Sequence, residues 1–225
     1  MLLRFTVSFD TLNHVHPGGA PLTKKRLRIG LFGGSFDPVH TGHVQLARAA
    51  LAELHLDRII FIPARQPPHK KKRSLTSSAR RCAMLSLALK PYPYFSLSRF
   101  ELKRSSTTYT YQTLQYFRKR FPDAELFFII GSDSLAELHR WRRSGLLAAL
   151  TTFIVGKRPD VLAEKFLFPG NARFLRHPVR KVSSSDIRVR GAEGKSIRGL
   201  VPETVRKYIQ KHKLYKIINM LSPCI

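Results

Sequence analysis

The chain has 225 residues, of which 43% are hydrophobic, and it carries 40 lysines and arginines against 14 aspartates and glutamates, a formal net charge of +26. This length suffices for one sizeable core, and no apolar stretch reaches the ~20 residues of a bilayer-spanning helix, so no membrane segment is expected. The positive field attracts polyanions, but the basic residues are scattered without an interleaved aromatic RNA-binding signature, which disfavours a nucleic-acid partner.

The first residues and the cysteines point away from secretion. The opening run MLLRFTVSF is interrupted by Arg4 and lacks the small-residue cleavage site of a secretory signal. Cys82 and Cys224 lie far apart in the sequence, so neither a disulfide framework nor a cysteine metal site is predicted. We therefore expect a cytoplasmic protein.

Sustained periodicity begins at Leu27. We expect residues 1–26 to form an N-terminal extension, residues 27–216 a single domain, and residues 217–225 a tail. The pattern predicts strands at residues 27–32, 57–63, 95–102, 125–131 and 151–156 and near Phe174, and helices at residues 44–54, 79–89 and 109–120, after residue 131, after Ser185 and from Pro202.

This alternation of elements indicates the fold class. Short strands that are almost continuously apolar, separated by helices, are typical of a parallel sheet covered on both faces. We predict an α/β domain with a doubly wound, Rossmann-like parallel sheet and a C-terminal helical segment. Ligands in such folds bind at the carboxyl ends of the strands, where the strand order reverses.

The stretch GLFGGSFDPVHTGH joins the first strand to the first helix. Gly33 and Gly34 follow the strand, where the lack of a side chain lets backbone amides approach a ligand. His40 and His43 stand where the helix begins, and a helix N-terminus binds anions. Two imidazoles three residues apart can donate to one phosphate, although two histidines alone would more often be a surface or capping pair. The stretch predicts a site for phosphoryl transfer.

A second polar motif lies near the other end of the domain. The segment VSSSDIRVR, Val182–Arg190, offers Ser184 and Ser185 as residue types that cap helices, and their hydroxyls suit a polyphosphate. Arg188 supplies a planar fork for phosphate oxygens. Without a partner motif, such a cap would more often be structural.

Together the two motifs resemble a known family. GLFGGSFDPVHTGH resembles the HxGH signature of the nucleotidyltransferase superfamily, in the GGSFDPxHxGH form of nicotinate-nucleotide adenylyltransferases. VSSSDIRVR resembles the ISSTxIR motif of that family, which lies about 140 residues further along the chain, as it does here. The resemblance covers about residues 27–216 and implies a nucleotidyltransferase fold.

The resemblance implies roles for individual residues. It implies that His40, His43 and Arg188 are catalytic and that no residue is a dedicated metal ligand. The implied ATP site comprises Gly33, Gly34, Ser35, Phe36, His40, His43, Gly131, Asp133, Lys157, Arg158, Ser184, Ser185, Ile187 and Arg188. The implied site for the second substrate comprises His69, Lys70, Thr108, Tyr109, Thr110, Asp133, Trp141 and Arg142.

The second substrate is assigned through the stretches PPHK, TYT, FIIGSDSL and GKRPD and through Trp141, the only tryptophan. In the family the last threonine of the second stretch helps to hold the nicotinate carboxylate, and the tryptophan stacks on the pyridine ring. From the residues alone, Asp133 could instead cap a helix, and Trp141 could be a core anchor. The departures from the family pattern are Thr108, Ser185, Asp160 and Arg142, the last in place of a tyrosine that contributes mainly its backbone amide.

The implied activity is transfer of the adenylyl group of ATP to nicotinate mononucleotide, giving deamido-NAD and pyrophosphate in NAD biosynthesis. Mg²⁺ is expected to bridge phosphate oxygens and to be carried mainly by substrate and water. One alternative is a sister adenylyltransferase acting on pantetheine phosphate or nicotinamide mononucleotide. Another is a catalytically idle, basic RNA-binding protein on the same fold. The sequence leaves the oligomeric state open, and a homo-oligomer is possible.

Overall fold

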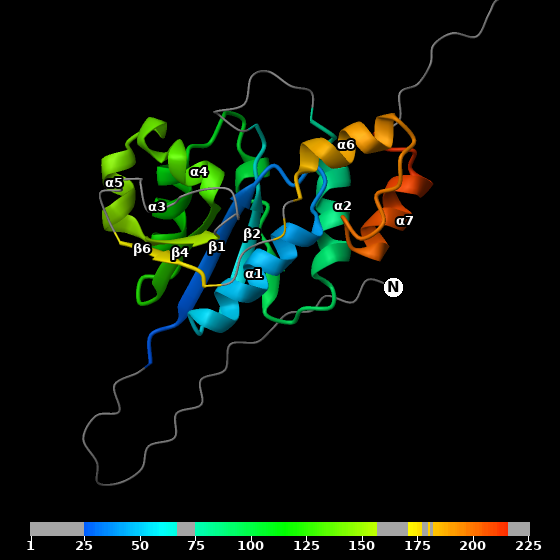
Figure 1. Cartoon of the computed structure of the whole chain (residues 1–225). Coiled ribbons are helices and arrows are strands. Elements are labelled where there is room, and N and C mark those ends of the chain that lie inside the picture. The colour runs from blue at the N-terminus through cyan, green and yellow to red at the C-terminus, as the bar shows by residue number, and fades with distance from the viewer. Residues whose placement is uncertain (1–24, 67–74, 157–170, 177–179, 181, 216–225) are drawn as a thin grey trace, which may run out of the picture.

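The computed structural model describes residues 25–66, 75–156, 171–176, 180 and 182–215. Within these residues, six parallel strands form one sheet in the order β3-β2-β1-β4-β5-β6 (Figure 1). The strands are β1 (Arg28–Gly34), β2 (Arg58–Pro63), β3 (Phe95–Leu97), β4 (Glu125–Gly131), β5 (Thr152–Gly156) and β6 (Ala172–Phe174). The helices are α1 (Thr41–Glu53), α2 (Ser78–Leu89), α3 (Thr110–Arg120), α4 (Ser132–Ala136), α5 (Ser144–Leu150), α6 (Ser184–Ala192) and α7 (Glu203–Lys211), with 3₁₀ helices η1 (Glu101–Lys103) and η2 (Leu138–Arg140).

Alternate residues of each strand point to opposite sides of the sheet, and helices pack on the apolar side chains of both sides. In β1, Phe32 joins a core cluster with α1 and α2, whereas Ile29 and Leu31 join a second cluster with α3 and α5. β2 alternates in the same way between Phe61 and Ile62. The predicted doubly wound α/β fold is confirmed, and the strand order reverses between β1 and β4, the point where ligands bind in such sheets.

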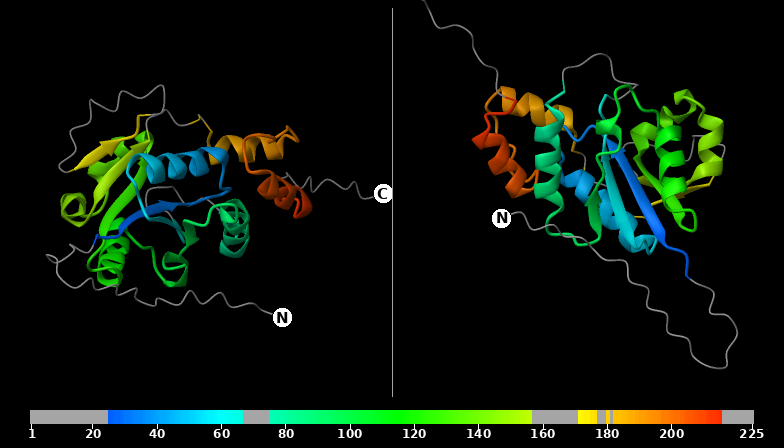
Figure 2. Two further views of the ribbon diagram at one scale, coloured as in Figure 1. Left: turned by 90° about the horizontal axis from the view of Figure 1, so that it is seen from below. Right: turned by 180° about the vertical axis from the view of Figure 1, so that it is seen from behind.

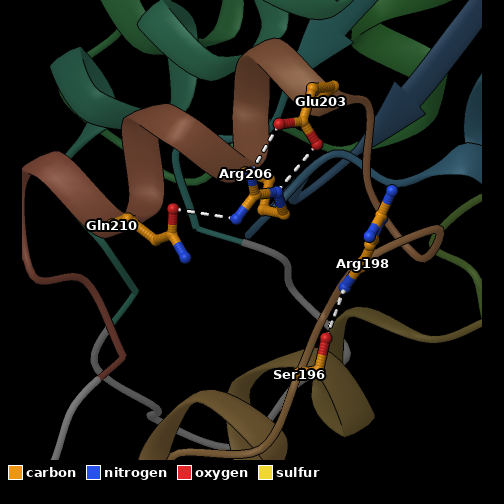
Figure 3. Close-up of polar contacts among 5 residues, drawn as sticks. All are labelled: Ser196, Arg198, Glu203, Arg206 and Gln210. Atoms are coloured by element: carbon orange, nitrogen blue, oxygen red, sulfur yellow. Dashed lines mark hydrogen bonds and ion pairs between the residues drawn. The ribbon is translucent and has the colours of Figure 1, made fainter.

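The C-terminal helices form one end of the molecule. α6 and α7 lie beside α2, on the side away from α3 and α5 (Figures 1 and 2). α7 buries Val205 and Ile209 against the core that contains α2. On its outer side, Arg206 Nε donates to Glu203 Oε2 at 2.7 Å and its Nη1 donates to Gln210 at 2.9 Å (Figure 3). The Arg206 hydrogen bond lowers the pKa of Glu203, but the pair is exposed and contributes little to folding.

Two predicted elements differ from the structure. The strand expected over residues 95–102 ends at Leu97, because the Ser98 hydroxyl accepts from Phe100 N at 3.3 Å and turns the chain into η1. The single helix expected after residue 131 is broken into α4, η2 and α5. The break follows from the extended backbone of Trp141 and the left-handed backbone of Arg143, whose φ is 57°.

No helix among the described residues is long and apolar enough to span a bilayer.

Candidate active site

A pocket of about 540 Å³ opens at the carboxyl ends of β1 and β4. Among the predicted site residues, those that line it are Gly33, Gly34, Ser35, His40, His43, Thr108, Thr110, Gly131, Asp133, Trp141, Ser184 and Ser185. The two polar motifs, which are separated by about 140 residues, therefore meet in one cavity because both follow elements that end at this edge of the sheet. His69, Lys70, Lys157 and Arg158 lie outside the described residues.

The two histidines cap the helix that follows them. His40 is the N-cap of α1: its Nδ1 accepts from His43 N, and His43 Nδ1 accepts from His40 N, each at 3.2 Å. The rings stack with centroids 3.5 Å apart. An imidazole whose Nδ1 accepts a hydrogen bond carries its proton on Nε2, so the cap selects a tautomer that donates through Nε2 in both rings. The alternative that the two histidines form a capping pair is confirmed, and their binding of phosphate stays a prediction with which this tautomer agrees.

Glycine between the histidines has a packing reason. A Cβ on Gly42 would lie 3.1 Å from His40 Nδ1 and 3.3 Å from Arg180 O, so a larger residue would displace the ring. Gly34 is similarly constrained, because a Cβ there would lie 3.1 Å from Phe36 Cζ. Phe36 is 1% exposed and packs with its ring centroid 5.0 Å from that of His43. The Phe36 side chain, which was predicted to belong to the ATP site, therefore packs in the core and supports the His43 ring.

The second motif touches the first directly. Ser184 Oγ donates to Pro38 O at 2.9 Å, and Arg188 donates to Asp37 O and, at 2.8 Å, to Ser185 Oγ. The N-cap of α6 is Ser183, whose hydroxyl accepts from Asp186 N at 3.1 Å, so the capping assigned to Ser184 and Ser185 is wrong by one residue. This shift leaves the next two hydroxyls facing the first motif. Ile187 is fully buried in the core and does not line the pocket.

A buried arginine fixes the loop between β1 and α1 from beneath. Arg81 is 1% exposed and donates through Nη1 to Ser35 O at 2.7 Å and Ala64 O at 2.8 Å, and through Nε to Thr76 O at 3.0 Å. Burial lowers the pKa of Arg81, and the nearby carboxylate of Asp37 opposes this shift. Asp37 in turn accepts from the Tyr215 hydroxyl at 2.8 Å, which connects the loop to the end of the described chain.

The opposite side of the pocket is formed by Glu101, Thr108, Thr110 and Trp141, which we call the acceptor end. Trp141 is half-buried and packs edge-on against Phe128 with centroids 6.3 Å apart, so it both supports the core and lines the cavity. Thr108 is 5% exposed, and its hydroxyl has no hydrogen-bond partner among the described residues.

Three other residues predicted on this side are placed differently from one another. Asp133 lies in the first turn of α4 and lines the cavity, and Gly131 is the N-cap, so the alternative of a capping Asp133 is wrong. Tyr109 and Arg142 do not line the pocket. Instead, the Arg142 guanidinium lies over the Tyr109 ring, 4.8 Å from its centroid, an arrangement that stabilises the loop after η2.

Five polar pocket residues were absent from the sequence prediction, namely Glu101, Ser134, Glu137, Arg180 and Ser183. Of these, Ser183 lies in the serine run and Ser134 in the stretch FIIGSDSL, whereas the other three had no sequence signal. Glu101 is 9% exposed, and its Oε1 accepts from the Thr113 hydroxyl at 2.8 Å. Burial raises the pKa of Glu101 from 4.5 to about 7, and the Thr113 hydrogen bond opposes this rise. Among the described residues no cluster of histidine, cysteine and carboxylate side chains could hold a metal.

Replacing Glu101 by glutamine is expected to stabilise the fold at alkaline pH. The folded-state pKa of Glu101 lies above 4.5, so the ionised side chain lowers the free energy of unfolding. This loss of stability is absent below about pH 4.5, grows as the pH rises, and reaches its full value above about pH 7. The glutamine variant avoids this cost, so its free energy of unfolding should exceed that of the parent by up to about 3 kcal/mol near pH 8 and by less than about 1 kcal/mol near pH 5. Urea unfolding at both values measures the difference. An equal difference at the two values would contradict the buried, neutral state.

Comparison with known proteins gives a consistent result. The cytidylyltransferase-like family model matches residues 31–190. A Thermomicrobium roseum protein named "Probable nicotinate-nucleotide adenylyltransferase" is 40% identical over 203 residues, which cover 87% of this chain and 95% of the relative. A Neisseria gonorrhoeae protein of the same name is 40% identical over 200 residues, 84% of this chain and 98% of the relative. The fold is similar to that of a Plasmodium falciparum nicotinic acid mononucleotide adenylyltransferase complexed with NaAD, with a TM-score of 0.74, 23% identity and coverage of 84% and 98% of the two chains.

Proposed function

This chain belongs to the nicotinate-nucleotide adenylyltransferase family, and from that membership we propose that it transfers the adenylyl group of ATP to nicotinate mononucleotide in NAD biosynthesis. The products are deamido-NAD and pyrophosphate. The observation that carries the proposal is that His40 and His43 of the first motif and Ser184 and Ser185 of the second line one and the same pocket. A site for a triphosphate needs donors on both sides of the phosphate chain, and these two motifs supply them.

The reaction requires positioning more than acid–base chemistry. An oxygen of the mononucleotide 5′-phosphate attacks the α-phosphorus of ATP, and the bond from that phosphorus to the oxygen bridging the α- and β-phosphates breaks. The attacking phosphate is already ionised near neutral pH and needs no strong base. The Nε2–H groups of His40 and His43 stabilise the negative charge that builds on the α-phosphoryl oxygens.

The leaving pyrophosphate is assigned to the second motif. Ser184 and Ser185 lie at the start of α6, where the backbone amides of the first helical turn bind anions, while the Ser184 hydroxyl donates to Pro38 O. Arg188 does not line the pocket and acts by positioning, since its guanidinium holds Ser185 and the backbone of Asp37. Mg²⁺ bound with ATP would neutralise negative charge on the phosphate chain, beside the donors of the two motifs.

An assay of pyrophosphate release with separate acceptors tests the function. We expect release with ATP and nicotinate mononucleotide, slower release with nicotinamide mononucleotide and none with pantetheine phosphate. Faster release with pantetheine phosphate would assign the chain to a sister reaction. RNA binding that weakens steeply with salt, without pyrophosphate release from any acceptor, would favour the idle RNA-binding alternative.

Replacing Trp141 by alanine is expected to weaken the binding of nicotinate mononucleotide and to leave the binding of ATP nearly unchanged. Removal of a stacking indole should raise the KM for nicotinate mononucleotide about tenfold, since cation–π contacts in a desolvated site contribute about 1–2 kcal/mol. The KM for ATP should change less than about twofold. Steady-state kinetics with each substrate varied measure both constants, and Trp141→Phe, which keeps an aromatic face, is the matched control. Equal rises in both constants would indicate lost packing against Phe128 instead.

A further inference from the structure

The acceptor end of the pocket contains a carboxyl group that has no part in the reaction described above. Glu101 belongs to η1, lines the pocket and is 9% exposed, and its side chain points to the first turns of α3 through the Thr113 hydrogen bond of 2.8 Å. Thr110 and Thr113 are three residues apart on α3 and so lie on one face of that helix. Glu101 is therefore placed beside the start of α3, where Thr110 lines the pocket and Thr113 is buried behind it.

Thr108 adds an unsatisfied polar group to the lining of the same pocket. Its hydroxyl is buried and has no hydrogen-bond partner among the described residues. Buried polar atoms are almost always paired, so this hydroxyl is a polar group that a small local shift would make available to a ligand in the pocket. A threonine hydroxyl can donate to a carboxylate or accept from an amide, so Thr108 by itself does not choose between the two.

Glu101 can distinguish a carboxylate from an amide, because its carboxyl group donates a hydrogen bond only when it is protonated. A neutral carboxyl donates one hydrogen bond, whereas a carboxylate only accepts and carries a negative charge. We propose that Glu101 is a specificity-determining residue: its neutral carboxyl donates to the carboxylate of an acidic pyridine nucleotide, and its ionised form repels that acid and accepts from the corresponding amide. This inference rests on the proposed function and adds to it a pH-dependent selection between two acceptors.

The setting of Glu101 makes the switch accessible near neutral pH. Burial is the larger influence on its pKa, which is raised to about 7, and the Thr113 hydroxyl opposes it. Charged and titratable groups on the surrounding elements are Lys103 and Arg104 of its own segment, Arg65 after β2, Tyr109 and Tyr111 with the overlying Arg142 and Arg143, and Asp133, Glu137, His40 and His43 in the pocket. All of these remain in a Glu101→Gln variant, so the difference between variant and parent isolates Glu101.

The test compares kcat/KM for nicotinate mononucleotide with kcat/KM for nicotinamide mononucleotide between about pH 6 and about pH 8.5. Both acceptors carry the same 5′-phosphate and use the same ATP site, so their ratio cancels every titration that they share. In the parent the acid-to-amide ratio should fall about tenfold over this range, since ionisation of one group with a pKa near 7 is nearly complete at its upper end. In Glu101→Gln, whose amide still donates, the ratio should stay high and change less than about twofold.

Two further variants separate selection from structure. Thr113→Val removes the hydrogen bond that lowers the Glu101 pKa, so the midpoint of the ratio profile should move to higher pH. Glu125→Gln, at the other end of β4 from the pocket, should keep the parent profile. If turnover of the amide is too slow, the quenching of Trp141 fluorescence gives the ratio of dissociation constants instead.

The possible results are distinct. A ratio that is independent of pH in the parent, or that falls equally in Glu101→Gln, would overturn the assignment of Glu101 while leaving the adenylyl transfer intact. Absence of pyrophosphate release with both pyridine nucleotides at every pH would instead overturn the proposed function.

Discussion

Replacement of His43 by alanine is expected to lower kcat by about 10²–10³-fold, the size found when one preorganised donor to a transition-state charge is lost. The capping geometry makes this effect specific to the chemical step. His43 Nδ1 is held by His40 N at 3.2 Å, so the proton resides on Nε2 before substrate binds and no reorganisation is needed. Because the charge on the α-phosphoryl oxygens grows only in the transition state, KM for ATP should change much less than kcat.

The alanine variant also loses half of the reciprocal cap of α1. That loss should lower the free energy of unfolding by about 1 kcal/mol, which leaves the fold intact. His139→Ala is the matched control, because His139 is exposed and does not line the pocket, and it should retain the parental kcat. Unchanged turnover in His43→Ala, measured by pyrophosphate release at saturating substrates, would contradict the catalytic role.

Replacement of Arg81 by methionine is expected to lower the free energy of unfolding by about 3–5 kcal/mol. The substitution keeps much of the buried volume but leaves the carbonyls of Ser35, Ala64 and Thr76 without their donor and Asp37 without its nearby cation. Of these, the Ser35 carbonyl and Asp37 belong to the loop that follows β1, so the loop that carries the histidines should also lose its fixed position.

Denaturant unfolding and steady-state kinetics measure the two consequences. Arg80→Met is the matched control, since Arg80 is the preceding residue of α2 and is exposed. It should change the free energy of unfolding by less than about 0.5 kcal/mol. A small loss in Arg81→Met, similar to that of the control, would mean that water replaces the guanidinium and that the loop is held by other contacts.

Much of the fold follows from local patterns. β1, β2, β4 and β5 are almost continuously apolar, and each is bounded by polar or turn-forming residues, so their positions could be predicted to within a few residues. The elements that differed are those decided by a single local contact. Ser98 ends β3 by a side-chain hydrogen bond, and Trp141 and Arg143 break the helix after β4, and none of these changes the hydrophobic period.

Some residues of the candidate site could likewise be predicted from local patterns, and others could not. The two motifs predicted to bind phosphate could be recognised because glycine, histidine and serine at fixed spacing leave a compact signature, and the structure brings both to one pocket. The place of Glu101 in the pocket could not be predicted, since the segment Glu-Leu-Lys has the pattern of the polar end of a strand. Arg81 was equally hidden, because one arginine in a helix with several basic residues gives no sign that it is buried.

The sequence by itself determined the parallel α/β architecture, the two phosphate motifs and the resemblance that assigns the acceptor, because each depends on the order and spacing of residues along the chain. Only the tertiary structure decided which tautomer the histidines adopt, which buried arginine holds their loop, and that a carboxyl group lies at the acceptor end. Hydrogen-bond partners and desolvation depend on which segments meet in space, and β2, η1 and α3 surround Glu101 from three separate stretches of the chain.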